Sequence, residues 1–134
     1  MLFNVDKCNV MHISKEPTQR EYQMNGRTLN VVQQEKDLGV LLPNNLKVSA
    51  QYQQACSKAL RILGMINRTI VYRHTDILLK LYKSMVRPHL EYCTVAWTPY
   101  YIKDKVLIQK VQRRFTRIIP SVSKLPYEQR LAKL

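Results

Sequence analysis

Four aspartates are the side chains best suited to metal-dependent chemistry, and each of them stands alone in the sequence: Asp6, Asp37, Asp76 and Asp104. Phosphoryl transfer by two metal ions needs carboxylates close enough to hold the ions about 3.5–4 Å apart. The chain contains no Asp-Asp pair. We interpret an isolated acid such as Asp37 as a turn or capping residue, and the sequence predicts no catalytic residue.

Two cysteine–histidine pairs have spacings that could contribute to a zinc site. They are Cys8 with His12, and His89 with Cys93. The second pair is spaced i, i+4, which on a helix places both side chains on one face. Structural zinc needs four ligands, and neither pair has a second pair nearby. Buried cysteine and hydrogen-bonded histidine are favoured, so no metal and no cofactor is predicted.

The charge of the chain is concentrated in its second part. The net charge is +13; residues 1–43 hold five basic and five acidic side chains, whereas residues 44–134 hold 17 basic and four acidic ones. Such a polarised molecule attracts polyanions, chiefly nucleic acid, or an anionic membrane face. No apolar run approaches the roughly 20 residues that span a bilayer, so no membrane segment is predicted.

The cations of the second part lie on predicted helix faces. On a helix over residues 101–119, five cations fall between about 20° and 120°, beside an apolar stripe between about 140° and 260°. A helix from Ser49 carries three more opposite its own apolar stripe. All eight are candidate contacts to a phosphate backbone, and a solvated helix face is the alternative. They are Lys103, Lys110, Arg113, Arg114, Arg117, Lys58, Arg61 and Arg68.

Six aromatic residues are candidates for stacking on nucleic-acid bases. They are Tyr72, Tyr82, Tyr92, Trp97, Tyr100 and Tyr101. We expect most of them to pack in the core instead, and Tyr82 and Trp97 in particular, since both stand among apolar residues.

The elements that position these residues change in type along the chain. Residues 1–45 read as short strands: one over Asn9–Ile13, a hairpin around Asn25-Gly26, and one over Asp37–Leu42. From Ser49 the period becomes helical, with Tyr52, Ala55, Cys56, Ala59, Leu63 and Ile66 on one stripe. A second helix is predicted from Thr75-Asp76, with Ile77, Leu78, Leu81 and Met85 on one face. Pro88 breaks it or opens a helix to Trp97, Pro120 ends the helix over 101–119, and Pro126 opens a short last one.

The predicted fold is therefore α+β, in two parts. Residues 1–45 form a small antiparallel β platform, and residues 46–134 form a basic, mostly α-helical bundle. The three cysteines are far apart, and nothing like a signal peptide follows Met1. An intracellular protein with reduced thiols is expected, without a choice between nucleus and cytoplasm.

Three sequence blocks carry a resemblance to a known family. They are KDLGV over 36–40, LYKSMVRPHLEYC over 81–93 and VQRR over 111–114, together with Phe3-Asn4 and Lys7-Cys8. In this order they resemble the last part of the reverse transcriptase of LINE-type (non-LTR) retrotransposons of the Jockey, CR1 and L2-like groups. The likeness covers nearly the whole chain, and the stretch from Val86 to Cys93 is its most specific part.

The resemblance implies a polymerase fragment without its chemistry. The start of the chain would correspond to the end of the palm, with Leu38, Gly39 and Val40 as primer-grip-like residues. The helices would correspond to the thumb, which clasps the primer–template duplex. In this family of RNA-directed DNA polymerases the catalytic aspartates precede the matching region. A retroelement copy truncated at its front would give such a chain.

The function expected from all this is binding of RNA or an RNA–DNA duplex without catalysis. Two alternatives stay open. One is a co-opted protein-interaction module that binds a protein partner or self-associates. The other is a retroelement-derived reading frame without a selected function.

Overall fold

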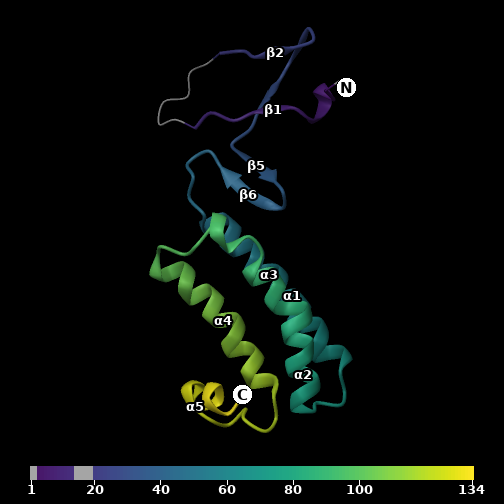
Figure 1. Cartoon of the computed structure of the whole chain (residues 1–134), viewed down its shortest axis with the longest axis vertical. Helices are drawn as coiled ribbons and strands as arrows, with labels where there is room; N and C mark the ends of the chain where they lie inside the picture. The colour runs from purple at the N-terminus through teal and green to yellow at the C-terminus, as the bar shows by residue number, and fades with distance from the viewer. Residues whose placement is uncertain (1–2, 14–19) are drawn as a thin grey trace. The chain divides into compact units, whose positions relative to one another are not determined.

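The computed structural model describes residues 3–13 and 20–134 and has the predicted α+β fold, with short strands followed by helices (Figure 1). The chain divides into two compact units, residues 1–51 and 52–134, whereas the sequence prediction placed the division at residue 46. Each unit is described by itself.

The first unit contains the predicted Asn-Gly hairpin. β2 (Gln23–Met24) and β3 (Arg27–Thr28) pair antiparallel around Asn25 and Gly26, which both have positive φ, at 50° and 74°. These are the angles for which Asn-Gly is selected in two-residue hairpin turns. The hairpin prediction is confirmed.

The strand predicted over Asp37–Leu42 is wrong, because the chain reverses within it. β5 (Gln34–Asp37) and β6 (Val40–Pro43) form an antiparallel hairpin whose two turn residues are Leu38, at φ 45°, and Gly39, at φ 87°. The amide of Leu41 in β6 donates to Oε1 of Gln51 at 2.9 Å, which ties this hairpin to the last residue of the unit.

Among the described residues of this unit, the predicted β platform consists of three two-stranded ladders, and one of them is not antiparallel. β1 (Asn9–Val10) pairs with β4 (Asn30–Val31), and this pair is parallel. The chain returns to β1 only after the β2–β3 hairpin, and it then runs in the direction of β1. A one-turn helix, η1 (Val5–Lys7), precedes β1, and the strand expected to reach Ile13 stops at Val10.

The second unit is built on α1 (Ser49–Thr69), whose predicted stripe is confirmed. All six of its residues are buried: Tyr52, Ala55, Cys56, Ala59, Leu63 and Ile66. Lys58, Arg61 and Arg68 are exposed on the opposite face, as the helical period requires,.

The next helical segment departs from the prediction at its centre. It consists of α2 (Thr75–Leu81), a π-helical turn η2 (Tyr82–Val86) and α3 (Arg87–Glu91). Pro88 lacks the N–H that an α-helix would direct at the carbonyl four residues earlier. Just before Pro88 the helix widens into the π turn, in which the amide of Arg87 donates to the carbonyl of Tyr82, five residues earlier.

This extra residue in the turn changes which side chains face the core. Met85, predicted on one face with Leu78 and Leu81, is exposed, while Val86 and Leu90 are buried four and eight residues after the half-buried Tyr82. Ile77, predicted on the same face, precedes the turn and is exposed as well. Of the two alternatives for Pro88, the structure has the proline in the first turn of a helix, α3, but this helix ends at Glu91 and does not reach Trp97. A short η3 (Thr94–Ala96) follows Cys93.

The last two helices follow the sequence closely. α4 (Ile102–Ile118) ends before Pro120, and α5 (Tyr127–Lys133) follows Pro126. α4 contributes Val111 and Phe115, and Ile119 directly after it, to a core shared with α1, α2, η2 and α3. The helical unit therefore has one hydrophobic core, which fixes which faces its helices turn to solvent.

Candidate nucleic-acid interface

The five predicted cations of α4 all lie on its exposed side. We call Lys103, Lys110, Arg113, Arg114 and Arg117 the α4 arc. The buried stripe of Val111 and Phe115 holds the helix against the core, so the neighbouring arc is forced outward,. At 1.5 Å per residue, the arc extends about 21 Å along the helix.

The α4 arc is not neutralised within the unit. Among the described residues, 3–13 and 20–134, the ion pairs are Arg27–Asp6, His74–Asp76 and Arg87–Glu91, and none includes a residue of the arc. Two arc residues lie over aromatic rings instead. The Lys103 ammonium is 5.3 Å from the ring centroid of Tyr101, and the Arg113 guanidinium is 4.8 Å from that of Tyr127. Such contacts orient a cation and leave its charge uncompensated.

The three cations of α1 form a second, separate strip. Lys58, Arg61 and Arg68 are exposed and lie opposite the buried stripe of α1, whereas the α4 arc lies beside the buried stripe of α4. The structure thus brings five of the eight predicted cations onto one helix surface and leaves the other three on another helix.

A buried polar cluster fixes the segment that leads into α4. Trp97 is fully buried and lies edge-on to Tyr52, with ring centroids 4.8 Å apart. The Tyr52 hydroxyl donates to the carbonyl of Trp97, and the Trp97 indole Nε1 donates to the carbonyl of Tyr92 at 2.7 Å. These bonds hold the 92–97 segment against α1.

Asp104 belongs to this cluster and was missed as a structural residue by the sequence analysis. It is 1% exposed, in the first turn of α4, where the positive end of the helix dipole favours an anion,. Burial and the charge of Asp104 raise the pKa of Tyr52 to about 12. The same two causes raise the pKa of the Cys56 thiol, which keeps it protonated and unreactive at neutral pH,. The sequence feature that could have indicated this role of Asp104 is its position in the first turn of the predicted helix,.

The aromatic residues divide differently from the prediction. Trp97 is buried and Tyr82 stacks on Phe115, with centroids 4.1 Å apart, so the two expected core residues are confirmed. The expectation that most of the six pack in the core is wrong. Four are exposed because they lie in connections between helices or at the start of α4: Tyr72, Tyr92, Tyr100 and Tyr101.

The primer-grip-like residues lie in the β5–β6 hairpin of the first unit. Leu38 and Gly39 form its exposed turn, and Val40 is buried. Only the first two therefore have a surface that a ligand can touch, and the role suggested for them stays a prediction.

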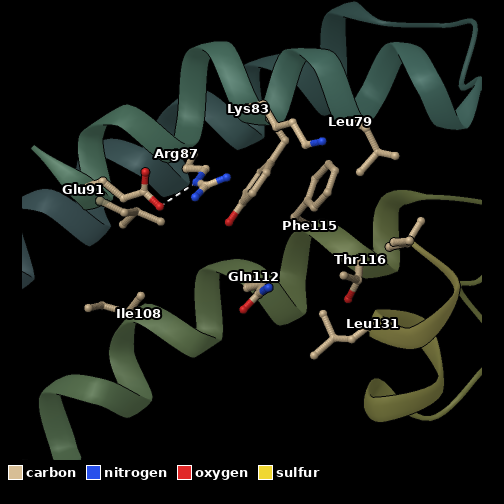
Figure 2. Close-up of a pocket in the computed structure, with 12 residues that line it drawn as sticks. Leu79, Lys83, Arg87, Glu91, Ile108, Gln112, Phe115, Thr116 and Leu131 are labelled. Atoms are coloured by element: carbon tan, nitrogen blue, oxygen red, sulfur yellow. Dashed lines mark hydrogen bonds and ion pairs between the residues drawn. The ribbon is translucent and has the colours of Figure 1, made fainter.

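A groove of about 470 Å³ lies between the η2–α3 segment and α4, with α5 at one end (Figure 2). Leu79, Ile108, Phe115 and Leu131 give it apolar walls. Most of its polar groups already have partners, since Arg87 pairs with Glu91 at 2.5 Å, Gln112 accepts from Tyr127, and Thr116 donates to the Arg113 carbonyl. Ligand pockets usually present free, convergent polar groups, and this groove has few.

The residues considered for metal chemistry are not brought together. Within 3–13 and 20–134, no group of three or more His, Cys, Asp or Glu side chains is placed to hold a metal ion. His89 and Cys93 do not share a helix face, because α3 ends at Glu91 and Cys93 is left-handed, with φ 55°. Within the same residues, no helix has the length and hydropathy to cross a membrane.

Comparisons with protein-family models, with curated proteins and with solved structures found no match to this chain. The candidate interface therefore rests on its own geometry, and the resemblance carried by the sequence blocks stays an expectation.

Proposed function

We propose that the chain binds RNA or an RNA–DNA duplex through the α4 arc and catalyses no reaction itself. The observation that carries this proposal is the exposure of five cations on one helix surface without an ion pair in the described residues. Lys and Arg side chains in such a row neutralise successive phosphates and release counterions, which gives affinity without reading sequence.

The size of the arc suits a duplex backbone. Phosphates of one strand of B-DNA recur about every 3.4 Å along the axis, so about 21 Å of helix surface faces about six of them. The second strip, on α1, would act as an additional contact. The likeness of the sequence blocks to the thumb of LINE reverse transcriptases supports the same ligand, since that thumb clasps a primer–template duplex.

The test is a titration of the full chain into a labelled RNA–DNA hybrid at several salt concentrations. Replacing Arg113, Arg114 and Arg117 with Ala should weaken binding at least about tenfold and reduce the salt slope by up to about three, one for each lost phosphate contact. Circular dichroism first establishes that the variant keeps its helices.

A matched control removes the same charge from the first unit. Lys7, Arg20 and Lys36 are exposed there, and replacing them with Ala lowers the net charge equally. If both triple variants bind alike, the affinity reflects overall charge and the α4 arc is not the site. A folded chain that binds nucleic acid weakly and without preference would move the assignment to protein interaction, and light scattering would then test self-association.

A further inference from the structure

Two exposed tyrosines stand at the start of α4. Tyr100 is 85% exposed and Tyr101 is 48% exposed, and their ring centroids are 5.5 Å apart at an interplanar angle of 88°. Tyr101 is the N-cap residue of α4, and its side chain makes no capping hydrogen bond. The Tyr101 side chain is therefore not needed to cap the helix, and a large part of the aromatic surface of both tyrosines faces water.

The segment that carries this pair is anchored. Trp97 is buried three residues earlier, and its main-chain carbonyl and indole Nε1 are both hydrogen-bonded, to Tyr52 and to Tyr92. The Thr98 hydroxyl also donates to the Thr94 carbonyl at 2.8 Å. Aromatic rings presented from a fixed backbone lose little conformational entropy when they bind a ligand.

The pair is continuous with the α4 arc. The Lys103 ammonium lies over the ring of Tyr101, at 5.3 Å from its centroid, so the first cation of the arc touches the second tyrosine. The arc then runs from Lys103 toward Arg117, away from the pair. A duplex that follows the arc would have one end next to the tyrosines.

We propose that Tyr100 and Tyr101 stack on unpaired bases at the end of the duplex held by the α4 arc. The preferred ligand is then a junction between a duplex and a single strand. This inference rests on the proposed function and names its substrate class. Aromatic rings beside cations are the usual platform for single-stranded nucleic acid, and stacking accepts any base because every base has a π-face.

The cationic surroundings favour nucleotides over an apolar partner. Val95, five residues before Tyr100, and Ile102, directly after Tyr101, are also exposed, and such side chains suit a protein or lipid surface,. However, Lys103 and Lys105 are exposed in the first turn of α4 and bring positive charge to the same place. A ligand with both anionic groups and flat rings fits this combination.

The experiment compares a blunt RNA–DNA hybrid of about 12 base pairs, twice the length facing the arc, with the same hybrid bearing an unpaired RNA extension. A fluorescent base analogue occupies the first unpaired position. We expect the extended hybrid to bind at least about fivefold more tightly, with quenching of the analogue as it stacks. Because stacking releases no counterions, this preference should persist as salt is raised.

Variants of the pair separate stacking from structure. Tyr100→Ala with Tyr101→Ala should abolish the preference and the quenching. Tyr100→Ala alone keeps the Tyr101 ring beneath Lys103, so it should reduce the preference while leaving affinity for the blunt hybrid unchanged. Phe at both positions keeps the rings and should keep the preference and the quenching. Tyr72→Ala is the matched control, because Tyr72 is exposed and lines a hollow with Pro120, beyond the opposite end of α4.

The outcomes separate this inference from the proposed function. Equal affinity for the two hybrids, or a preference that survives the double Ala variant, overturns the stacking role while the arc can still bind. An unchanged affinity for the blunt hybrid after loss of Arg113, Arg114 and Arg117 overturns the arc itself. A chain that binds neither hybrid overturns both.

Discussion

Different interactions stabilise each of the two units of the chain internally. Among the described residues of 1–51, Val40 is the one buried hydrophobic side chain, and order comes from short ladders and main-chain bonds such as Val32 N–H to the Val10 carbonyl at 2.8 Å. Residues 52–134 bury side chains from α1, α2, η2, α3 and α4 in one core. The second unit also carries 16 basic against four acidic side chains.

This difference determines which unit can present binding residues in a fixed arrangement. A helix packed by one stripe presents its remaining faces at fixed angles, so a row of cations there is already arranged before a ligand arrives. A two-stranded ladder without a buried face fixes its side chains less firmly, and such ladders are marginal in water by themselves. The α4 arc belongs to the first kind of surface, and the hairpin turn at Leu38 belongs to the second.

The two phenylalanines of the chain give the largest expected contrast between the units. Phe115 is 3% exposed and stacks on Tyr82, whereas Phe3 is 78% exposed. Phe115→Ala should lower the free energy of unfolding of the helical unit by about 3–5 kcal/mol. Phe3→Ala should change the same free energy of unfolding by less than about 0.5 kcal/mol. Urea unfolding followed by helix circular dichroism measures both, and similar values would contradict the assignment of Phe115 to the core.

The helices of the second unit could be predicted because burial repeats with the helical period. Tyr52, Cys56 and Leu63 recur on one stripe of α1, and Pro120 removes the donor that α4 would need to continue,. The exposure of the α4 arc followed from the same geometry. The Asn25-Gly26 turn was predictable because its two residues tolerate positive φ.

What could not be predicted depends on packing or on strain. Because of the π turn before Pro88, Val86 is buried where Met85 was expected to be. No residue pattern predicts where a helix forms such a turn to accommodate the missing N–H of a proline. The turn at Leu38 and Gly39 could not be predicted from the sequence, because leucine disfavours the positive φ that Leu38 has there,. The exposure of Tyr100 also escaped prediction, since residues in a connection follow no period.

The pH dependence of stability should also differ between the units, through Tyr52. The folded protein holds the Tyr52 proton more tightly than the unfolded chain, with a pKa of about 12 against an ordinary value of 10.0. The protonated Tyr52 hydroxyl therefore contributes fully to the free energy of unfolding below pH 10, and this contribution is lost as the pH rises toward 12. At neutral pH, Tyr52→Phe should cost about 1 kcal/mol for the lost hydrogen bond to the Trp97 carbonyl,.

Above pH 10 this cost of Tyr52→Phe should shrink, because the variant has no phenol to deprotonate. Urea unfolding of both proteins between neutral pH and pH 11 measures the difference. Tyr100→Phe, which removes an exposed hydroxyl, is the control for general alkaline effects. A cost that is independent of pH would mean that the Tyr52 hydroxyl is not desolvated in the folded state.

A smaller effect is expected in the first unit, at the strained turn of the β5–β6 hairpin. Leu38 has φ 45° and is 84% exposed, so its side chain gains little from packing. Asparagine tolerates this backbone better, and Leu38→Asn should stabilise the hairpin by up to about 1 kcal/mol. Amide hydrogen exchange in β5 and β6 should slow by up to about fivefold. Faster exchange would show that the Leu38 side chain contributes more than the strain costs.

The smallest expected effect asks whether the position of a charge matters beyond its sign. Glu91 in the second unit and Asp6 in the first are both exposed carboxylates paired with an arginine, at 2.5 Å and 2.9 Å. Exposed pairs contribute little to stability, so Glu91→Gln and Asp6→Asn should leave the unfolding midpoints unchanged. Both changes raise the net charge equally. Only Glu91→Gln releases an arginine within the basic unit, and it should raise affinity for a blunt RNA–DNA hybrid by about twofold at low salt. If Asp6→Asn raises affinity as much, attraction by total charge explains binding, and the contrast between the two units has no part in it.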